Sequence, residues 1–239
     1  RHGNLSLEYG EDFQFYDSCD MSASAQQIET LYLQETARYG VDNVALLTPY
    51  RQKTETGVNA LNERLREKLN PQDGKKPEVA YRKRIYRLGD KVMQIKNNYQ
   101  IEWETRNRYG IPVDSGAGVF NGDIGIIREI NTFAEELTVE FDEGKVVDYS
   151  FKQLEELELA YAITIHKSQG SEYPAVVIPV HSGPRMLMTR NLIYTAVTRA
   201  RKCVCLVGVP ETFQAMVDNG MEQRRYSGLK DRILELAQL

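Results

Sequence analysis

The stretch TIHKSQGSEY, residues 164–173, carries hydroxyl, imidazole, amide and carboxylate groups between two apolar runs. Thr164 and His166 could donate hydrogen bonds to phosphate oxygens, whereas the carboxylate of Glu172, which only accepts, suits a sugar hydroxyl. Gly170 lets a partner approach the backbone closely. A polar turn without a ligand remains the alternative for this stretch taken alone. The residue types together favour a ligand that carries phosphate and sugar groups.

Two arginines that follow apolar runs permit a second kind of chemistry. Arg199, in NLIYTAVTRARK at 191–202, lies at the C-terminal end of a predicted helix, and Arg51 follows a predicted strand in ALLTPYRQ. A guanidinium group is planar, always charged and bidentate, so it can stabilise charge that develops on a transferring phosphoryl group. The simpler alternatives are stabilisation of the helix end for Arg199 and an ordinary surface position for Arg51.

The elements that position these residues alternate between strand and helix in the first and last parts of the chain. Short apolar runs predict buried strands at 13–18, 43–48, 160–165, 175–180 and 203–208. Helices are predicted at 22–40, 58–70, 187–200, 210–218 and 222–238. Ser24 and Gln27 form a possible capping box for the first helix, Gly40 its stop, and Pro71 ends the second.

The stretch 164–172 would then lie at the carboxyl edge of a parallel sheet, because it follows a buried strand. Ligands usually bind at that edge in open α/β folds. We expect Arg51 at the same edge.

The pattern changes between about residues 85 and 152 to short β-runs separated by turn residues. The predicted strands are KVMQIKN, IGIIREI, LTVEF and KVVDYS, and Asp142-Glu143-Gly144 joins the last two as a hairpin. Residues 100–118 are predicted to form a long exposed loop. The sequence therefore predicts an α/β fold in which a parallel-sheet domain, residues 1–84 and 153–239, contains an inserted β-barrel at 85–152.

Composition limits the class of protein. The 239 residues carry a net charge of −4, yet residues 51–108 hold 15 basic and 8 acidic side chains. Such a segment could meet phosphates or form a solvated face. The sequence contains no run of 18 apolar residues, so it predicts no membrane-spanning helix. The start has no apolar signal segment and no initiating Met, so we expect a fragment of a longer chain.

The three cysteines do not form a disulfide framework. Cys203 and Cys205 lie two residues apart in a predicted strand, where both would face the same side as small core residues. Cys19 is alone in the sequence. Free cysteines of this kind indicate a reducing, cytoplasmic location.

The quoted stretches resemble three motifs of superfamily 1 helicases, in the family's order. LLTPYR resembles motif IV, TIHKSQGSEYP motif V and YTAVTRA motif VI. RLGDKVMQIKNNY, followed by VFNGDIGII, resembles the inserted barrel of RecD-like helicases, the type related to the exodeoxyribonuclease V alpha subunit. The resemblance covers nearly the whole chain. It implies a RecA-like motor domain with an inserted SH3-like barrel.

The resemblance also implies roles at the matching positions. Arg199 resembles the arginine finger, and Arg51 resembles a second arginine that faces the γ-phosphate of ATP. Glu172 resembles the glutamate that holds the ribose, and Gln169 and Gly170 shape the same loop.

Contacts with single-stranded DNA are implied for a second group of residues. Thr164 and His166 resemble residues that grip the DNA backbone or couple that grip to the nucleotide. Asn121, Lys91 and Lys96 lie in the barrel, which in this family flanks the DNA channel.

No phosphate-loop pattern, G-x-x-x-x-G-K followed by Ser or Thr, occurs in the sequence. LTVEFDEG imitates a metal-binding Walker B strand, but Gly144 and the strand after it indicate a hairpin instead. The resemblance implies an ATP-dependent 5′–3′ DNA helicase of recombination or repair, and the missing phosphate loop implies that this chain is its second motor domain, inactive alone. A first motor domain of the same chain would supply the phosphate loop and the Mg²⁺ ligand, and nuclease-complex subunits are further expected partners.

Other classes of protein remain open at this point. The barrel could be a binding module in which Tyr99 and Trp103 recruit a partner protein, since exposed aromatic residues mark interaction sites. The chain could also be the helicase part of a conjugative relaxase, or an inactive subunit of a nuclease complex.

Overall fold

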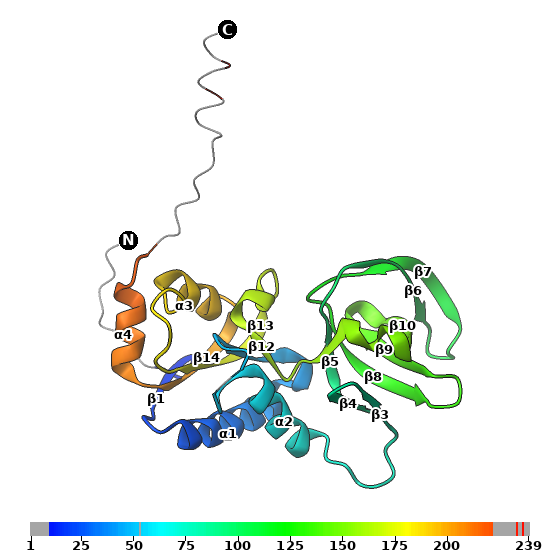
Figure 1. The fold of residues 1–239 in the computed structure, drawn as a ribbon, viewed down its shortest axis with the longest axis horizontal. Helices are drawn as coiled ribbons and strands as arrows, with labels where there is room; N and C mark the ends of the chain where they lie inside the picture. Colours follow the sequence, from blue (N-terminus) through cyan, green and yellow to red (C-terminus); the bar gives the residue numbers. More distant parts are fainter. Residues whose placement is uncertain (1–9, 53, 222–232, 234–235, 237–239) are drawn as a thin grey trace.

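The computed structural model describes residues 10–52, 54–221, 233 and 236. Its two main sheets, one parallel and one antiparallel, lie side by side (Figure 1). The parallel sheet is built from the first and last parts of the described chain, and the antiparallel sheet from the residues between them. None of the described helices is long and apolar enough to cross a membrane.

The parallel sheet has the order β1-β14-β13-β2-β12, and every strand pairing in it is parallel. Its strands are β1 (Phe13–Asp17), β2 (Val44–Thr48), β12 (Ala162–Thr164), β13 (Tyr173–Val180) and β14 (Ala200–Gly208). The five predicted buried strands are therefore confirmed. β2 is buried along its whole length, as expected for a parallel strand that helices cover on both faces.

Helices cover both faces of this sheet (Figure 1). They are α1 (Met21–Tyr39), α2 (Val58–Leu69), α3 (Arg190–Val197) and α4 (Pro210–Asp218). Leu61 and Leu65 of α2 pack with α1 in the core of one face, whereas Leu192 of α3 and Met216 of α4 pack in the core of the other. The helix predicted over 58–70 is therefore confirmed.

The start of α1 differs from the prediction. Asp20 caps the helix, because its carboxylate accepts a hydrogen bond of 2.7 Å from the backbone N–H of Ala23. The predicted capping box of Ser24 and Gln27 is therefore wrong. Gly40 does end the helix, with a φ of 88° that glycine adopts without strain.

Of the two helices predicted over 187–200 and 222–238, only the first lies wholly in the described part of the chain. The helix expected over 187–200 is shorter, since α3 ends at Val197 and β14 begins at Ala200. Arg199 consequently lies in the junction between helix and strand. The helix expected over 222–238 lies outside the described residues, apart from 233 and 236.

Cys203 and Cys205 are buried in β14 on the side that α1 covers, with their sulfur atoms 3.8 Å apart. Their prediction as core residues is confirmed. The structure also places a carboxylate oxygen of Glu35 within 4.8 Å of both sulfur atoms, a neighbour that the sequence spacing did not indicate.

The antiparallel sheet has the order β11-β5-β8-β9-β10-β6-β7 and encloses its own apolar core. Its strands are β5 (Lys91–Gln94), β6 (Asn98–Arg106), β7 (Pro112–Val119), β8 (Ile124–Asn131), β9 (Glu136–Phe141), β10 (Lys145–Ser150) and β11 (Leu157–Leu159). The four predicted strands are confirmed. The turn Asp142–Gly144 joins β9 to β10 as a hairpin, with positive φ at Glu143 and Gly144, so the Walker B alternative is excluded.

The long exposed loop expected over 100–118 is wrong, because β6 and β7 form an antiparallel hairpin there. Trp103 lies opposite Gly116 in this hairpin, and a Cβ on that glycine would lie 2.5 Å from the indole ring. Glycine thus makes room for the tryptophan across the strand pair. The glycines and charges that indicated a loop are instead features of an exposed hairpin.

A second hairpin, β3 (Glu78–Tyr81) with β4 (Arg84–Arg87), was not predicted. It connects α2 to the barrel (Figure 1). At the other end of the barrel, β11 pairs with β5, so the antiparallel sheet continues past residue 152, where the predicted barrel ends. The division of the chain into domains at 84 and 153 stays a prediction.

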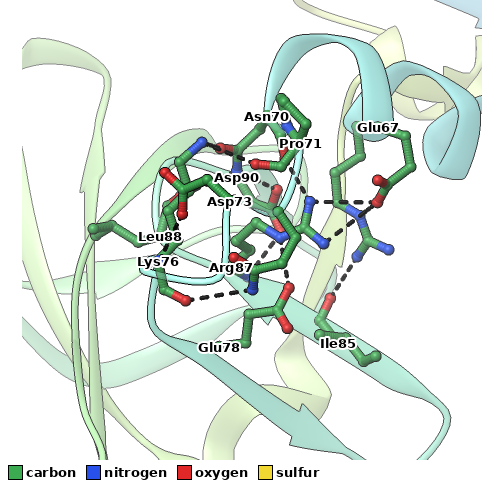
Figure 2. A network of polar contacts seen from close by, with 12 residues as sticks. Glu67, Asn70, Pro71, Asp73, Lys76, Glu78, Ile85, Arg87, Leu88 and Asp90 are labelled. Atoms are coloured by element: carbon green, nitrogen blue, oxygen red, sulfur yellow. Dashed lines mark hydrogen bonds and ion pairs between the residues drawn. The ribbon is translucent and has the colours of Figure 1, made fainter.

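A buried polar network joins α2 to this second hairpin and to the start of the barrel (Figure 2). The guanidinium of Arg87, 6% exposed, pairs with Glu78 and Glu67 and donates to the carbonyl of Asn70. The side chain of Asn70 donates to Asp90, which also accepts from the backbone N–H of Arg87. Burial raises the pKa of Asp90, although these hydrogen bonds oppose the shift.

Candidate nucleotide and nucleic-acid sites

The loop after β12 crosses the parallel sheet from one edge to the other. Thr164 ends β12 and is aligned with Thr48, the last residue of β2, so it lies at the carboxyl edge. Tyr173 begins β13 and is aligned with Ala200, the first residue of β14, so it lies at the amino edge. The eight residues between Thr164 and Tyr173 therefore reach both edges, whereas we expected the whole stretch at the carboxyl edge.

The loop is held by a short 3₁₀ turn, Ile165–Ser168, that buries its two end residues. The hydroxyl of Ser168 donates to the carbonyl of Ile165 at 2.7 Å. His166, Gln169 and Gly170 remain exposed. Gly170 has a φ of 90° and open space where a Cβ would lie, so the backbone conformation, and not the packing, favours glycine there.

Arg199 and Glu172 both lie at the amino edge. The guanidinium of Arg199 donates to the carbonyls of Ser171 and Thr195, at 3.1 and 3.2 Å, and to the hydroxyl of Thr198. Within residues 10–52 and 54–221, no carboxylate forms an ion pair with it. Glu172 pairs instead with the exposed Arg201 at 2.8 Å. Arg199 is therefore a positioned cation whose charge the neighbouring carboxylate does not neutralise.

Arg51 lies at the opposite edge of the sheet, beside Thr164 and Lys167. Its guanidinium forms an ion pair with Glu158 of β11 and is 45% exposed. The register of β2, β12 and β13 separates the two edges by about 20 Å of strand. The expectation that Arg51 and Arg199 face the same phosphate is thus not met by this structure, because the chain leaves β2 at one edge and enters β14 at the other.

The barrel residues Asn121 and Lys96 are exposed, as a role in DNA binding requires. The backbone N–H of Asn121 donates to Asn97, and Lys96 forms an ion pair with Glu155 at 2.8 Å. The adjoining Gly122 approaches the loop after β12, since its added Cβ would lie 3.9 Å from the carbonyl of Lys167. The turn that contains Asn121 therefore lies next to this loop.

A cavity of about 470 Å³ separates the barrel from the amino edge. Ser171, Glu172 and Tyr173 line it on the sheet side, and Gly122 and Asp123 on the barrel side. The loop after β12 thus borders both the sheet edge and the barrel.

Lys91 cannot take the DNA-binding role predicted for it, because its side chain is buried. It is 1% exposed, and its ammonium group donates to the backbone carbonyls of Val41 and Val44, at 2.7 and 3.4 Å. The ammonium group of a barrel strand is therefore inserted into the parallel-sheet domain. Lys91 fixes the junction between the two sheets.

The burial of Lys91 predicts an unusual pH dependence of stability. Burial lowers the pKa of Lys91 from 10.5 to about 8, against the attraction of Asp42 and Asp142. Between those two pH values the unfolded chain keeps a proton that the folded chain has lost, so this group makes folding more favourable as pH rises. We expect a gain of roughly 3 kcal/mol at most.

The measurement is urea unfolding of the protein and of Lys91→Met at pH 7.5 and pH 10. The difference in unfolding free energy between the two proteins removes the contribution of the tyrosines, several of which have raised pKa values because they are buried. We expect the unfolding free energy of the unsubstituted protein, relative to that of Lys91→Met, to be larger at pH 10 than at pH 7.5. An equal difference at both pH values would contradict the lowered pKa of Lys91.

Three further charged residues near Arg51 carry little signal in the sequence. Lys167 lies inside the stretch 164–173, whereas Arg84 and Glu158 belong to strands that no motif marks. All three side chains meet at the carboxyl edge. Only the position of Lys167, three residues after Thr164, offered a signal.

The parallel sheet, its covering helices and the inserted barrel define the class of fold: a RecA-like domain that contains an SH3-like barrel. Residues 61–141 match the family described as the SH3 domain of ATP-dependent RecD-like DNA helicases. Residues 159–207 match the UvrD-like helicase C-terminal domain, and this match includes the loop after β12, α3 and Arg199.

Relatives with curated names agree with these matches. The ATP-dependent RecD2 DNA helicase of Deinococcus radiodurans is 34% identical over 81% of this chain and 24% of that protein. The RecBCD enzyme subunit RecD of Mycobacterium tuberculosis is 28% identical over 95% of this chain and 37% of that protein. The resemblance to the C-terminal part of RecD-like superfamily 1 helicases is therefore confirmed.

Similar solved structures include the Pif1 helicase of Bacteroides bound to single-stranded DNA. It has a TM-score of 0.44 and 15% identity, over 90% of this chain and 54% of that one. The Pif1 helicase of Candida albicans has a TM-score of 0.42 and 15% identity, over 91% and 57%. This chain spans between about a quarter and two fifths of the length of the two curated relatives named above.

Proposed function

We propose that this chain is the second motor domain of an ATP-dependent DNA helicase that moves 5′ to 3′ on single-stranded DNA in recombination or repair. The observation that carries the proposal is the loop Ile165–Glu172, which connects two groups of side chains at opposite edges of one sheet. One group fits a nucleotide and the other fits a nucleic acid backbone.

The nucleotide group comprises Arg199, Glu172, Gln169 and Gly170 at or near the amino edge. Arg199 suits an arginine finger, because its guanidinium is positioned by three neutral oxygens and keeps its charge for a triphosphate. The carboxylate of Glu172 is exposed and only accepts hydrogen bonds, so it suits a ribose hydroxyl. ATP would supply the phosphoryl group whose transfer drives the motor.

The DNA group comprises Thr164 and His166 at the carboxyl edge, with Asn121 and Lys96 of the barrel nearby. Hydroxyl and imidazole groups there can donate to backbone phosphates without reading the base sequence. The loop Ile165–Glu172 contains Glu172 and His166, follows Thr164 directly, and accepts a hydrogen bond from Arg199 at the carbonyl of Ser171. A movement of Glu172 or Arg199 upon hydrolysis would therefore shift Thr164 and His166 as well. This connection is the route by which we propose that ATP hydrolysis moves the DNA.

The sequence of this chain has no phosphate loop, so the proposal requires another motor domain, the first one of the helicase. That domain, from the same longer chain, would supply the phosphate loop and the Mg²⁺ ligands across a cleft. Subunits of a nuclease complex are proposed as further partners, since one relative carries the name of a RecBCD subunit.

A direct test compares the 239-residue chain with the longer protein that contains it. We expect the isolated chain to hydrolyse no ATP above background in a phosphate-release assay, because it contributes only one wall of the nucleotide site. The longer protein should hydrolyse ATP faster when oligo(dT) is added. Normal turnover by the isolated chain would refute the proposal.

A further inference from the structure

The carboxylate of Glu158 is surrounded by three cations at the carboxyl edge of the parallel sheet. It forms an ion pair with Arg51, lies 2.5 Å from the guanidinium of Arg84, and lies 3.4 Å from the ammonium of Lys167. These cations come from three separate segments: the loop after β2, the β3–β4 hairpin and the loop after β12. The cluster therefore has two more positive than negative charges.

The cations of this cluster are more accessible than the carboxylate between them. The side chains of Arg51 and Arg84 are 45% and 42% exposed, whereas that of Glu158 is 14% exposed. Burial lowers the pKa of Lys167; Arg51 and Arg84 add to the shift and Glu158 opposes it. One carboxylate therefore does not compensate for the burial of Lys167 and the repulsion among the cations.

A cavity of about 420 Å³ opens beside this cluster. Arg66 and Lys83 add positive charge to its lining, which Arg51 and Arg84 share with the acidic Glu63 and Glu158. A smaller pocket connects Arg51, Glu158 and Lys167 with Thr164. The cavity is thus an electropositive recess that borders a proposed DNA contact.

The first turn of α2 also lines this recess, at Val58 and Asn59. Among residues 10–52 and 54–221, no side chain caps the helix there, and the backbone N–H of Asn59 donates to the carbonyl of Arg51 at 3.3 Å. The partial positive charge of the helix start adds to that of the three cations.

We propose that Arg51, Arg84 and Lys167 bind a backbone phosphate of single-stranded DNA, and that Glu158 competes with this phosphate for the same cations. Guanidinium groups bind carboxylates and phosphates with the same bidentate geometry, so one can replace the other. The proposal rests on the proposed function, and it assigns Arg51 to the DNA and not to the nucleotide. Glu158 then limits DNA affinity, and its release frees β11 from the loop after β12.

The experiment measures binding of fluorescent dT15 to the longer helicase by anisotropy, at several salt concentrations. Glu158→Gln should bind dT15 roughly 3- to 10-fold more tightly at low salt, and the slope of log K against log salt should steepen by about 0.7 for each phosphate gained. Arg84→Gln should weaken binding. In the Arg84→Gln background, the gain from Glu158→Gln should shrink.

Glu29→Gln is a matched control. Glu29 is also 14% exposed and also pairs with two cations, Arg64 and Lys68, but it lies on α1, outside the lining of the recess. The same change of charge there should leave both the affinity and the salt slope unchanged. Glu158→Asp, which keeps the charge but shortens its reach, provides a milder variant if Glu158→Gln folds poorly.

Each possible result decides a different point. If the unsubstituted protein binds no dT15, the proposed function fails and this inference fails with it. If it binds, but the variants at Glu158 bind equally or more weakly while their unfolding midpoints stay native, only the competition is refuted. If the gain appears for a non-hydrolysable ATP analogue and not for dT15, the phosphate belongs to the nucleotide and the DNA assignment is wrong.

Discussion

If Arg199 is the proposed arginine finger, Arg199→Ala in the longer protein that contains this chain is expected to reduce ATP hydrolysis roughly 10³- to 10⁵-fold, the usual effect of removing such a finger. ATP binding should change only a few-fold, because most of the affinity would come from the other motor domain and from Glu172. The physical reason lies in the surroundings of Arg199, whose guanidinium is aimed by carbonyl and hydroxyl oxygens and meets no carboxylate within residues 10–52 and 54–221.

Two further variants sharpen this measurement. Arg199→Lys keeps the charge but loses the planar, bidentate group, so hydrolysis should also fall steeply. Arg190→Ala removes an exposed arginine from the first turn of α3, the helix that precedes Arg199, and should leave the rate within a few-fold. Single-turnover hydrolysis and binding of a fluorescent ATP analogue would be measured for all three. A rate within a few-fold of normal for Arg199→Ala would eliminate the finger assignment.

Arg87→Met is expected to destabilise the chain by about 1–3 kcal/mol, the usual cost of leaving a buried polar group without its hydrogen-bond partner. The substitution leaves Glu78 and the carbonyl of Asn70 without their guanidinium partner in the network of Figure 2. The hydrogen bond from Arg87 is also the main reason why the pKa of Glu78 lies below its usual value. The stability that Glu78 contributes through this hydrogen bond is present above the pKa of Glu78 in the unfolded chain. It is lost as pH falls through the lower pKa that Glu78 has in the folded chain.

The control for Arg87 is an exposed arginine of the same hairpin. Arg82 is 69% exposed and pairs with Glu155, itself 38% exposed, so Arg82→Ala should cost no more than about 1 kcal/mol. Urea unfolding followed by tryptophan fluorescence would report both variants, since Trp103 lies in the barrel. Equal, small effects at both positions would show that the network at the junction contributes little to stability.

Polar contacts at three places connect the barrel and its hairpin to the parallel-sheet part of the chain. Arg87 and Asp90 connect the hairpin to α2, Lys91 inserts its ammonium group under β2, and Glu158 reaches Arg51 and Lys167. Three separate polar contacts thus tie the barrel to the parallel sheet. Arg87 and Lys91 are buried in the first two, whereas Arg51 in the contact at Glu158 is 45% exposed and open to a competing anion.

Much of the fold was predictable because the signals are local. The five buried strands, the helix over 58–70 and the hairpin at Asp142–Gly144 follow from apolar periodicity and turn residues, and all of them are confirmed. The prediction of a loop over 100–118 was wrong because the residues there are polar. β6 and β7 carry charges and glycines since they form an exposed hairpin, in which Trp103 packs against Gly116. A single sequence does not distinguish that pattern from a loop.

By itself, the sequence determined which residue types lie in the loop after β12 and at the end of α3, and this was enough to recognise the helicase resemblance. Only the tertiary structure decided which of those residues meet. Arg199 and Glu172 lie at the same edge because β13 and β14 are parallel and begin together there, and Arg51 is held at the other edge, where β2 ends. Lys91 is buried and Glu158 lies among three cations because distant segments converge at the junction of two sheets, and no local pattern encodes that convergence.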